Sequence, residues 1–152
     1  MKLRLVWVGK TRNPSLHKLS QDYIARIGHF LPLKIVEVKE PQGGGNKRVE
    51  AEGKKLLETM DSSDRVVMLD PKGKTWTSQQ LAAFMQKHMT EDPRQLTFVI
   101  GGFDGLSEEV KRRADIHWSL SPLTFTHELT RVVLLEQIYR ALSIIHNLPY
   151  SK

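Results

Sequence analysis

The chain has 152 residues and no cysteine, and its 23 Lys plus Arg against 17 Asp plus Glu give a formal net charge of +6. This length fits one domain with its own core. The absence of cysteine excludes thiolate nucleophiles, disulfides, Cys-ligated zinc and iron–sulfur clusters. Neither a signal-peptide pattern nor an apolar run of membrane-spanning length occurs, so we expect a cytoplasmic protein without a membrane segment.

The positive charge is concentrated near the N-terminus. Residues 1–55 carry 12 Lys and Arg against 5 Asp and Glu, and the remaining residues are close to neutral. Such asymmetry favours a polyanionic partner, because each neutralised phosphate adds affinity that does not depend on sequence. A merely solvated basic surface is an equally good interpretation of charge alone.

The first half of the chain alternates strand and helix patterns. Alternating apolar residues predict strands at 3–8 and 33–38, and a third, short buried strand is predicted at 65–69. Asn13 followed by Pro14 is a typical start for the first helix, and a second helix is predicted from Val49 to Met60.

The second half continues the same alternation. Thr77-Ser78-Gln79-Gln80 is a capping box that opens a helix, and strands are predicted at 96–100 and 116–120. Ser107 caps a short helix, and Thr126 begins a long last one. The pattern predicts an α/β fold, a parallel sheet covered by helices on both faces, in a single domain without repeats.

In parallel sheets, ligands bind beyond the carboxyl ends of the strands. This rule selects Gly9 and the segments 70–74, 101–105 and 121–125. A Rossmann site is not indicated, because the first strand ends in a single glycine rather than G-x-G-x-x-G. Lys72-Gly73-Lys74 lacks P-loop spacing and indicates a turn after the third strand, and the six histidines show no metal-binding spacing, so we expect no metal.

The last helix is apolar on two sides. Leu134, Leu135, Ile138, Ala141, Leu142 and Ile145 share one face, whereas Leu129, Val132 and Val133 lie towards the other. Such a helix packs against its own sheet and against a second surface, and the simplest second surface is another copy of the chain. We therefore expect a homodimer.

His127 and Arg131 lie one turn apart at the start of this helix. One interpretation is an internal salt bridge, for example between Arg131 and Glu128. The alternative is that Arg131 recognises an anion or substrate, with His127 held neutral by the positive end of the helix and able to accept a proton.

Four segments together resemble one family: IGGFDGLS at 100–107, SLSPLTF at 119–125, HELTR at 127–131 and LEQIYRA at 135–141. The pattern LDxxGK at 69–74 and the terminal Pro149-Tyr150 agree with it. The chain resembles the ribosomal RNA large subunit methyltransferase H family of the SPOUT superfamily. Two positions depart from the family pattern: Thr126 replaces a common Pro, and Ser151 replaces a terminal His.

The resemblance implies a SPOUT domain over residues 1–152, whose C-terminal part, from about residue 66 to 152, forms a trefoil knot that binds S-adenosylmethionine. It implies methylation of N3 of a pseudouridine in the 23S rRNA of the assembled ribosome, by a homodimer whose basic part is residues 1–55. The family's cofactor site corresponds to Leu69, Gly101, Gly102, Leu120, Ser121, Pro122, Leu123, Thr124 and Phe125.

For the reaction itself, the resemblance suggests His127 as a polar contact or proton acceptor and Arg131 and Arg140 as groups that bind phosphate or orient the base. Tyr150 would pack against the nucleotide. The alternative of a different class is a noncatalytic RNA-binding or ribosome-associated dimer, which would not bind S-adenosylmethionine. An enzyme using another nucleotide at Gly101-Gly102 is less favoured, because the sequence lacks a phosphate-binding loop.

Overall fold

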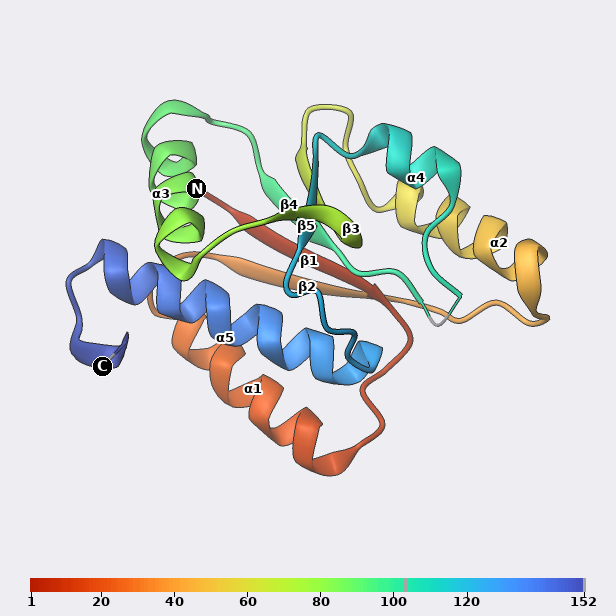
Figure 1. The fold of residues 1–152 in the computed structure, drawn as a ribbon, viewed down its shortest axis with the longest axis horizontal. Coiled ribbons are helices and arrows are strands. Elements are labelled where there is room, and N and C mark those ends of the chain that lie inside the picture. Colours follow the sequence, from red (N-terminus) through yellow and green to blue (C-terminus); the bar gives the residue numbers. More distant parts are fainter. Residues whose placement is uncertain (103, 152) are drawn as a thin grey trace.

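The computed structural model describes residues 1–102 and 104–151, apart from the side chain of Ser151, so the predicted motif residue Phe103 lies outside it (Figure 1). Within the described residues the predicted alternation of strands and helices is confirmed. The elements are β1 (Leu3–Val8), α1 (Pro14–Gly28), β2 (Leu33–Val38), α2 (Gly45–Glu58), β3 (Arg65–Thr75), α3 (Ser78–Glu91), β4 (Leu96–Val99), α4 (Glu108–Arg113), β5 (Ile116–Ser119), α5 (His127–Ile145) and a short 3₁₀ turn, η1 (Pro149–Ser151).

The strands form one five-stranded sheet in the order β2-β1-β4-β3-β5. Every pairing is parallel, which confirms the predicted α/β class. Because the strands are parallel, all their carboxyl ends lie at the same edge of the sheet. β2 and β5 are its two outer strands.

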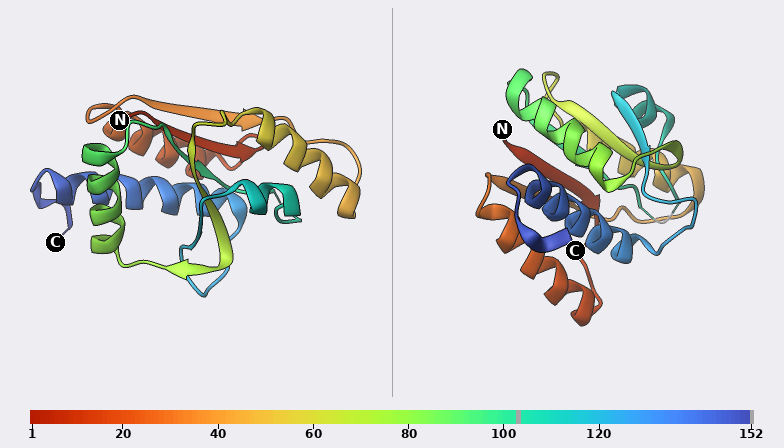
Figure 2. Two further views of the ribbon diagram at one scale, coloured as in Figure 1. Left: turned by 90° about the horizontal axis from the view of Figure 1, so that it is seen from above. Right: turned by 60° about the vertical axis from the view of Figure 1, so that its left-hand side comes forward.

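Helices cover both faces of the sheet (Figure 2). On one face, α1, α3 and α5 enclose a large apolar core with the odd-numbered residues of β1, such as Leu5 and Trp7. On the other face, α2 and α4 cover a smaller core that contains Val6 and Val8. No helix in the described part of the chain is long and apolar enough to cross a bilayer.

The predicted helix starts are confirmed by their hydrogen bonds. The side chain of Asn13 accepts from the backbone N–H of Ser15 and Leu16, and Thr77 forms a capping box with Gln80. Ser107 and Thr126 likewise accept from backbone N–H groups two or three residues into α4 and α5. These local signals fix where each helix begins.

The predicted end of the third strand and the turn at Lys72-Gly73-Lys74 are wrong. β3 continues to Thr75, and both Leu69 and Lys74 pair with Trp118, so the residues between them form a bulge within the strand. A Cβ on Gly73 would lie 2.6 Å from the backbone carbonyl carbon of His117. The close approach of two backbones therefore explains the glycine.

Helix α5 lies between α1 and α3, as Figure 1 shows. Part of its second apolar side is thus buried within the same chain, including Val132. Leu129 remains 37% exposed and Val133 half-buried. These residues leave a narrow apolar strip on the outer side of α5.

Candidate functional site

A pocket of about 520 Å³ lies at the carboxyl edge of the sheet, where the sequence analysis expected a ligand. The bulge of β3, the segments that follow β4 and β5 and the first turns of α5 form most of its walls. This volume is in the usual range for sites that bind small molecules or cofactors. The lining consists of Leu69, Asp70, Pro71, Ile100, Gly101, Gly102, Gly105, Leu106, Lys111, Ser119, Leu120, Ser121, Leu123, Thr124, Phe125, Thr126, His127 and Thr130.

The fold brings the predicted cofactor residues together. Leu69, Gly101, Gly102, Leu120, Ser121, Leu123, Thr124 and Phe125 all line this pocket, and Pro122 is the one predicted member outside the lining. These residues come from three segments that are separated by up to about fifty positions in the sequence. Their convergence follows from the parallel strand order.

The glycines after β4 are explained by close packing at two positions and by backbone conformation at a third. A Cβ on Gly101 would lie 2.7 Å from Cγ of Leu106, and one on Gly102 would lie 2.5 Å from Oε2 of Glu52. Gly105 has a positive φ of 92°, and its N–H donates to the carbonyl of Gly102 over 3.1 Å. Gly101 and Gly102 therefore have no room for a side chain, whereas Gly105 is favoured by its positive φ alone.

Glu52 of α2 lies behind this loop, and the sequence analysis did not select it. Its side chain is 1% exposed, and its nearest cation is Arg48, whose Nε lies 3.7 Å away. Among the described residues neither carboxylate oxygen has a hydrogen-bond partner. Burial raises the pKa of Glu52, although Arg48 opposes this effect. Nothing in the sequence around Glu52 indicates that it is buried, because its burial depends on how α2 packs in the fold.

The segment between β5 and α5 forms the wall nearest to solvent. Ser119 Oγ donates to the carbonyl of Ser121, whose own Oγ accepts from the N–H of Leu123. Leu123 itself is 73% exposed. The wall is thus held by its own hydrogen bonds and presents an apolar side chain at the mouth.

Charged and polar groups reach the pocket from several elements. Asp70 accepts from the N–H of Lys72, and its Oδ2 lies 3.6 Å from Nδ1 of His117. Nε2 of His117 lies 2.9 Å from the carbonyl oxygen of Lys111, which also lines the pocket. His127, at the start of α5, is half-buried in the wall. The pocket therefore combines apolar walls with a few polar groups.

Arg131 is buried within the fold and is not among the residues that line the pocket. Its guanidinium donates to the carbonyl of Val8 over 2.6 Å and to Oγ1 of Thr11 over 3.0 Å, and it stacks on Trp7. Burial lowers the pKa of Arg131. These contacts tie α5 to the segment that follows β1.

The salt bridge between Arg131 and Glu128, one of the two interpretations offered by the sequence, does not form among the described residues. Glu128 instead accepts from the backbone N–H groups of Asn13 and Arg12, at 3.0 and 2.9 Å. These two hydrogen bonds, Asn13 first, hold the pKa of Glu128 below its ordinary value. The carboxylate is used to close the loop before α1, a contact that helical spacing does not reveal.

Arg140 and Tyr150 form a separate cluster at the other end of α5. The guanidinium of Arg140 pairs with Glu136 at 2.9 Å, and Tyr150 Oη donates to the same carboxylate at 2.8 Å. Tyr23 Oη lies 2.9 Å from Tyr150 Oη. The hydrogen bond to Glu136 raises the pKa of Arg140, and burial followed by these hydrogen bonds raises the pKa of Tyr150.

This cluster is remote from His127 within one chain. His127 and Arg140 are thirteen residues apart in the same helix, which corresponds to about 20 Å at 1.5 Å per residue. A single nucleotide cannot contact both groups in one chain. Of the four predicted catalytic residues, His127 therefore lies in the pocket wall and Arg131 is buried as an anchor of α5. Arg140 and Tyr150 belong to the distal cluster.

The fold and the pocket define a class: a parallel α/β protein with a largely apolar, glycine-edged ligand pocket at the carboxyl edge of its sheet, and without a Rossmann fingerprint. A family model described as "Predicted SPOUT methyltransferase" matches residues 1–151. The chain belongs to this family of SPOUT methyltransferases.

The similarity to individual relatives extends over their full length. The protein from Syntrophotalea carbinolica is 42% identical over 153 residues, which cover 99% of this chain and 98% of that protein. Proteins from Trichlorobacter lovleyi and Geobacter sulfurreducens are 42% and 40% identical, with 99% of each chain covered. All three relatives bear the name "Ribosomal RNA large subunit methyltransferase H".

Proposed function

We propose that the chain transfers the methyl group of S-adenosylmethionine to N3 of a pseudouridine in the 23S rRNA of the assembled ribosome, which locates its action in the cytoplasm. Membership of the SPOUT methyltransferases and the name of its full-length relatives support this proposal. The observation that carries it is the pocket, because eight of the nine residues expected at the cofactor line it.

The residues of the pocket fit S-adenosylmethionine. Gly101 and Gly102 line the pocket with backbone atoms, and Leu69, Leu120 and Phe125 offer apolar surface for an adenine ring. Asp70 and Lys111 supply one charge of each sign, which matches the ammonium and carboxylate of the methionine part. When bound, the cofactor supplies a sulfonium methyl group that reacts once a nucleophile is aligned with it.

The protein's own task is then alignment and proton removal. Methyl transfer needs the attacking nitrogen within about 3–3.5 Å of the methyl carbon. N3 of the base carries a proton that must leave, and His127 in the pocket wall is the proposed acceptor or polar contact. Arg131 contributes by anchoring the start of α5, and hence His127, to β1.

We propose that the active unit is a homodimer. The apolar strip at Leu129 and Val133 on the outer side of α5 supports this, as does the separation of about 20 Å between His127 and Arg140. If two α5 helices pack in antiparallel orientation about a two-fold axis, the distal cluster of one protomer lies beside the pocket of the other. Arg140 and Tyr150 would then orient the nucleotide in the partner's site.

The C-terminal part of the chain, from about residue 66, is proposed to form the trefoil knot of the superfamily, within a single domain. Family membership supports this topology.

The competing function is a noncatalytic RNA-binding dimer. The methyltransferase must bind S-adenosylmethionine, whereas the noncatalytic dimer would not bind it, so cofactor binding distinguishes the two functions.

Two measurements test the proposal. Calorimetry with S-adenosylmethionine should show binding, and labelled cofactor should transfer its methyl group to intact ribosomes more efficiently than to free large subunits. Binding without transfer to any ribosomal substrate would favour the noncatalytic module.

Two variants test the assigned residues under single-turnover conditions. His127→Ala and Tyr150→Phe should each slow methyl transfer while S-adenosylmethionine still binds. Lys87→Ala is the control, because Lys87 pairs with Glu91 on the exposed side of α3. Full transfer rates in both variants would contradict the assignment.

A further inference from the structure

The cations in residues 1–55 fall into two groups. All four arginines pair with carboxylates: Arg4 with Asp64, Arg12 with Glu40, Arg26 with Asp22, and Arg48 with Glu40 and Glu52. In contrast, none of the eight lysines lies within ion-pairing distance of a carboxylate in the part of the chain that the structure describes. The excess positive charge of this region therefore resides on its lysines.

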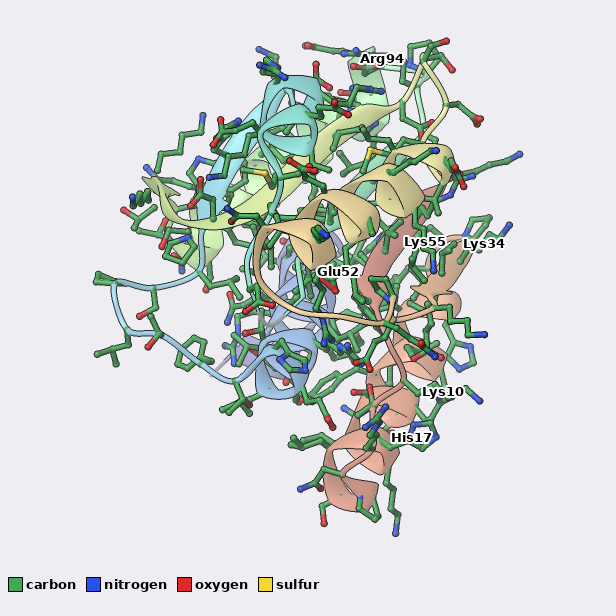
Figure 3. All side chains as sticks on the ribbon, turned by 90° about the vertical axis from the view of Figure 1, so that its right-hand side faces the viewer. Lys10, His17, Lys34, Glu52, Lys55 and Arg94 are labelled. Carbon is green, nitrogen blue, oxygen red and sulfur yellow. The ribbon has the colours of Figure 1, made fainter. Side chains whose placement is uncertain are left out.

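Four of these lysines lie along the β2 edge of the sheet: Lys10, Lys34, Lys39 and Lys55. Figure 3 shows Lys10, Lys34 and Lys55 projecting from the same side of the molecule. Nζ of Lys55 donates to the carbonyl of Lys39 over 3.3 Å, which links α2 to the end of β2. We refer to these four residues as the β2-edge lysines.

The β2-edge lysines follow the strand towards the pocket. Lys34 and Lys39 are five residues apart, which corresponds to roughly 16 Å of extended chain. Lys39 directly follows β2 and Lys10 comes two residues after β1, so both lie at the carboxyl edge where the pocket opens. β1 separates β2 from β4, which places the two strands about 10 Å apart.

Protection of an edge strand does not explain this arrangement. Lysines on an edge strand discourage pairing with other strands, but of the four only Lys34 lies within β2. Lys10, Lys39 and Lys55 occupy the neighbouring loops and α2. Their clustering on one side therefore needs another explanation.

The character of this surface favours a polyanion over an apolar partner. Among the described residues, the exposed large apolar side chains are Leu19 in α1, Leu123 at the pocket mouth, Leu129 in α5 and Leu148 in the C-terminal segment. None of them lies on β2 or α2, so this edge offers no large apolar side chain for insertion into a lipid surface. Flexible lysines carry compact charges that suit an irregular line of phosphates.

We propose that Lys10, Lys34, Lys39 and Lys55 bind successive phosphates of the RNA substrate along the β2 edge, while the nucleotide to be methylated enters the pocket. This inference rests on the proposed function and adds the path of the RNA. The surface lies beside α2, on the face of the sheet opposite to α5. It therefore stays accessible in a dimer formed through α5.

The test compares two triple variants with the same change in charge. Lys34→Ala/Lys39→Ala/Lys55→Ala removes three β2-edge lysines, and Lys2→Ala/Lys18→Ala/Lys87→Ala removes three lysines from other surfaces. Binding to 23S rRNA and to ribosomes is measured over a range of salt concentrations. Each phosphate contact contributes about 0.7–0.9 to the slope of log K against log salt. The first variant should lose about two to three units of slope, and the second should keep the wild-type slope.

Calorimetry with S-adenosylmethionine and thermal unfolding accompany the binding data. Unchanged cofactor affinity and melting temperature in both variants show that a loss of RNA binding is local. The triple Lys→Arg variant at positions 34, 39 and 55 should retain the wild-type slope, because it retains the charge.

Three outcomes overturn the inference. Equal slopes for the two alanine variants would mean that the cations act only through net charge. Binding of the wild type to anionic phospholipid vesicles but not to RNA would assign the surface to a membrane. If the wild type methylates ribosomes and both variants bind RNA normally, the RNA path is wrong while the proposed function stands. If the wild type neither binds S-adenosylmethionine nor transfers methyl groups, the proposed function itself fails.

Discussion

Gly102→Ala is the smallest change that tests how the pocket is built. The added methyl group would lie 2.5 Å from Oε2 and 2.7 Å from Oε1 of Glu52, well inside contact distance. Glu52 is 1% exposed and has no route to solvent without a shift of α2. Overpacking of this kind costs about 1–3 kcal/mol. If the loop relieves the clash by moving into the pocket, S-adenosylmethionine binds roughly 5- to 150-fold more weakly.

The assay combines calorimetry with S-adenosylmethionine and thermal unfolding of the free protein. Gly28→Ala is the matched control, because a Cβ there meets no atom within 4 Å, and it should leave binding unchanged. Adding Glu52→Ala to Gly102→Ala should restore much of the lost affinity, since the carboxylate that blocks the methyl group is gone. Wild-type affinity in Gly102→Ala, or no coupling with Glu52→Ala, would refute this account of the loop.

Three further predictions concern buried contacts. Burial raises the pKa of Glu52 above its ordinary value of 4.5, so its ionised form costs stability at neutral pH. Glu52→Gln should therefore raise the melting temperature at pH 8, and the gain should shrink as the pH falls towards 4.5; a gain independent of pH contradicts this. Gly53→Ala should lower the free energy of unfolding in urea by about 1–3 kcal/mol, because the added Cβ would overlap the side chain of Ser107. Unchanged stability would show that α2 and α4 separate easily. Asp64→Ala leaves the largely buried Arg4 without its carboxylate partner and should lower the free energy of unfolding by about 3–5 kcal/mol. A loss below about 1 kcal/mol would mean that water replaces the carboxylate.

Local signals in the sequence predict the elements well. Asn13, Thr77, Ser107 and Thr126 each cap a helix because their hydrogen bonds reach only two or three residues along the chain. The pocket was also predictable, since parallel strands bring their carboxyl ends to one edge. Its glycines and the segment 121–125 lie where that rule places them.

Contacts between distant segments were not predictable. The bulge in β3 depends on the close approach of Gly73 to β5, and the helical spacing of Arg131 gave no hint of its bonds to Val8 and Thr11. Glu52 is an ordinary surface residue by composition and is buried only because α2 packs on the loop after β4. Each of these features requires two segments that only the fold brings together.

The proposals for the path of the RNA and for the shared dimeric site both assume that the protein methylates the RNA of the large ribosomal subunit. The most direct test incubates the protein and labelled S-adenosylmethionine with ribosomes that lack the modification, followed by digestion of the 23S rRNA and identification of the labelled nucleoside. The label should appear as N3-methylpseudouridine at a single position, and it should be lost in a variant that no longer binds the cofactor. Label in another nucleoside, or none in ribosomes to which the protein binds, would contradict the proposed function.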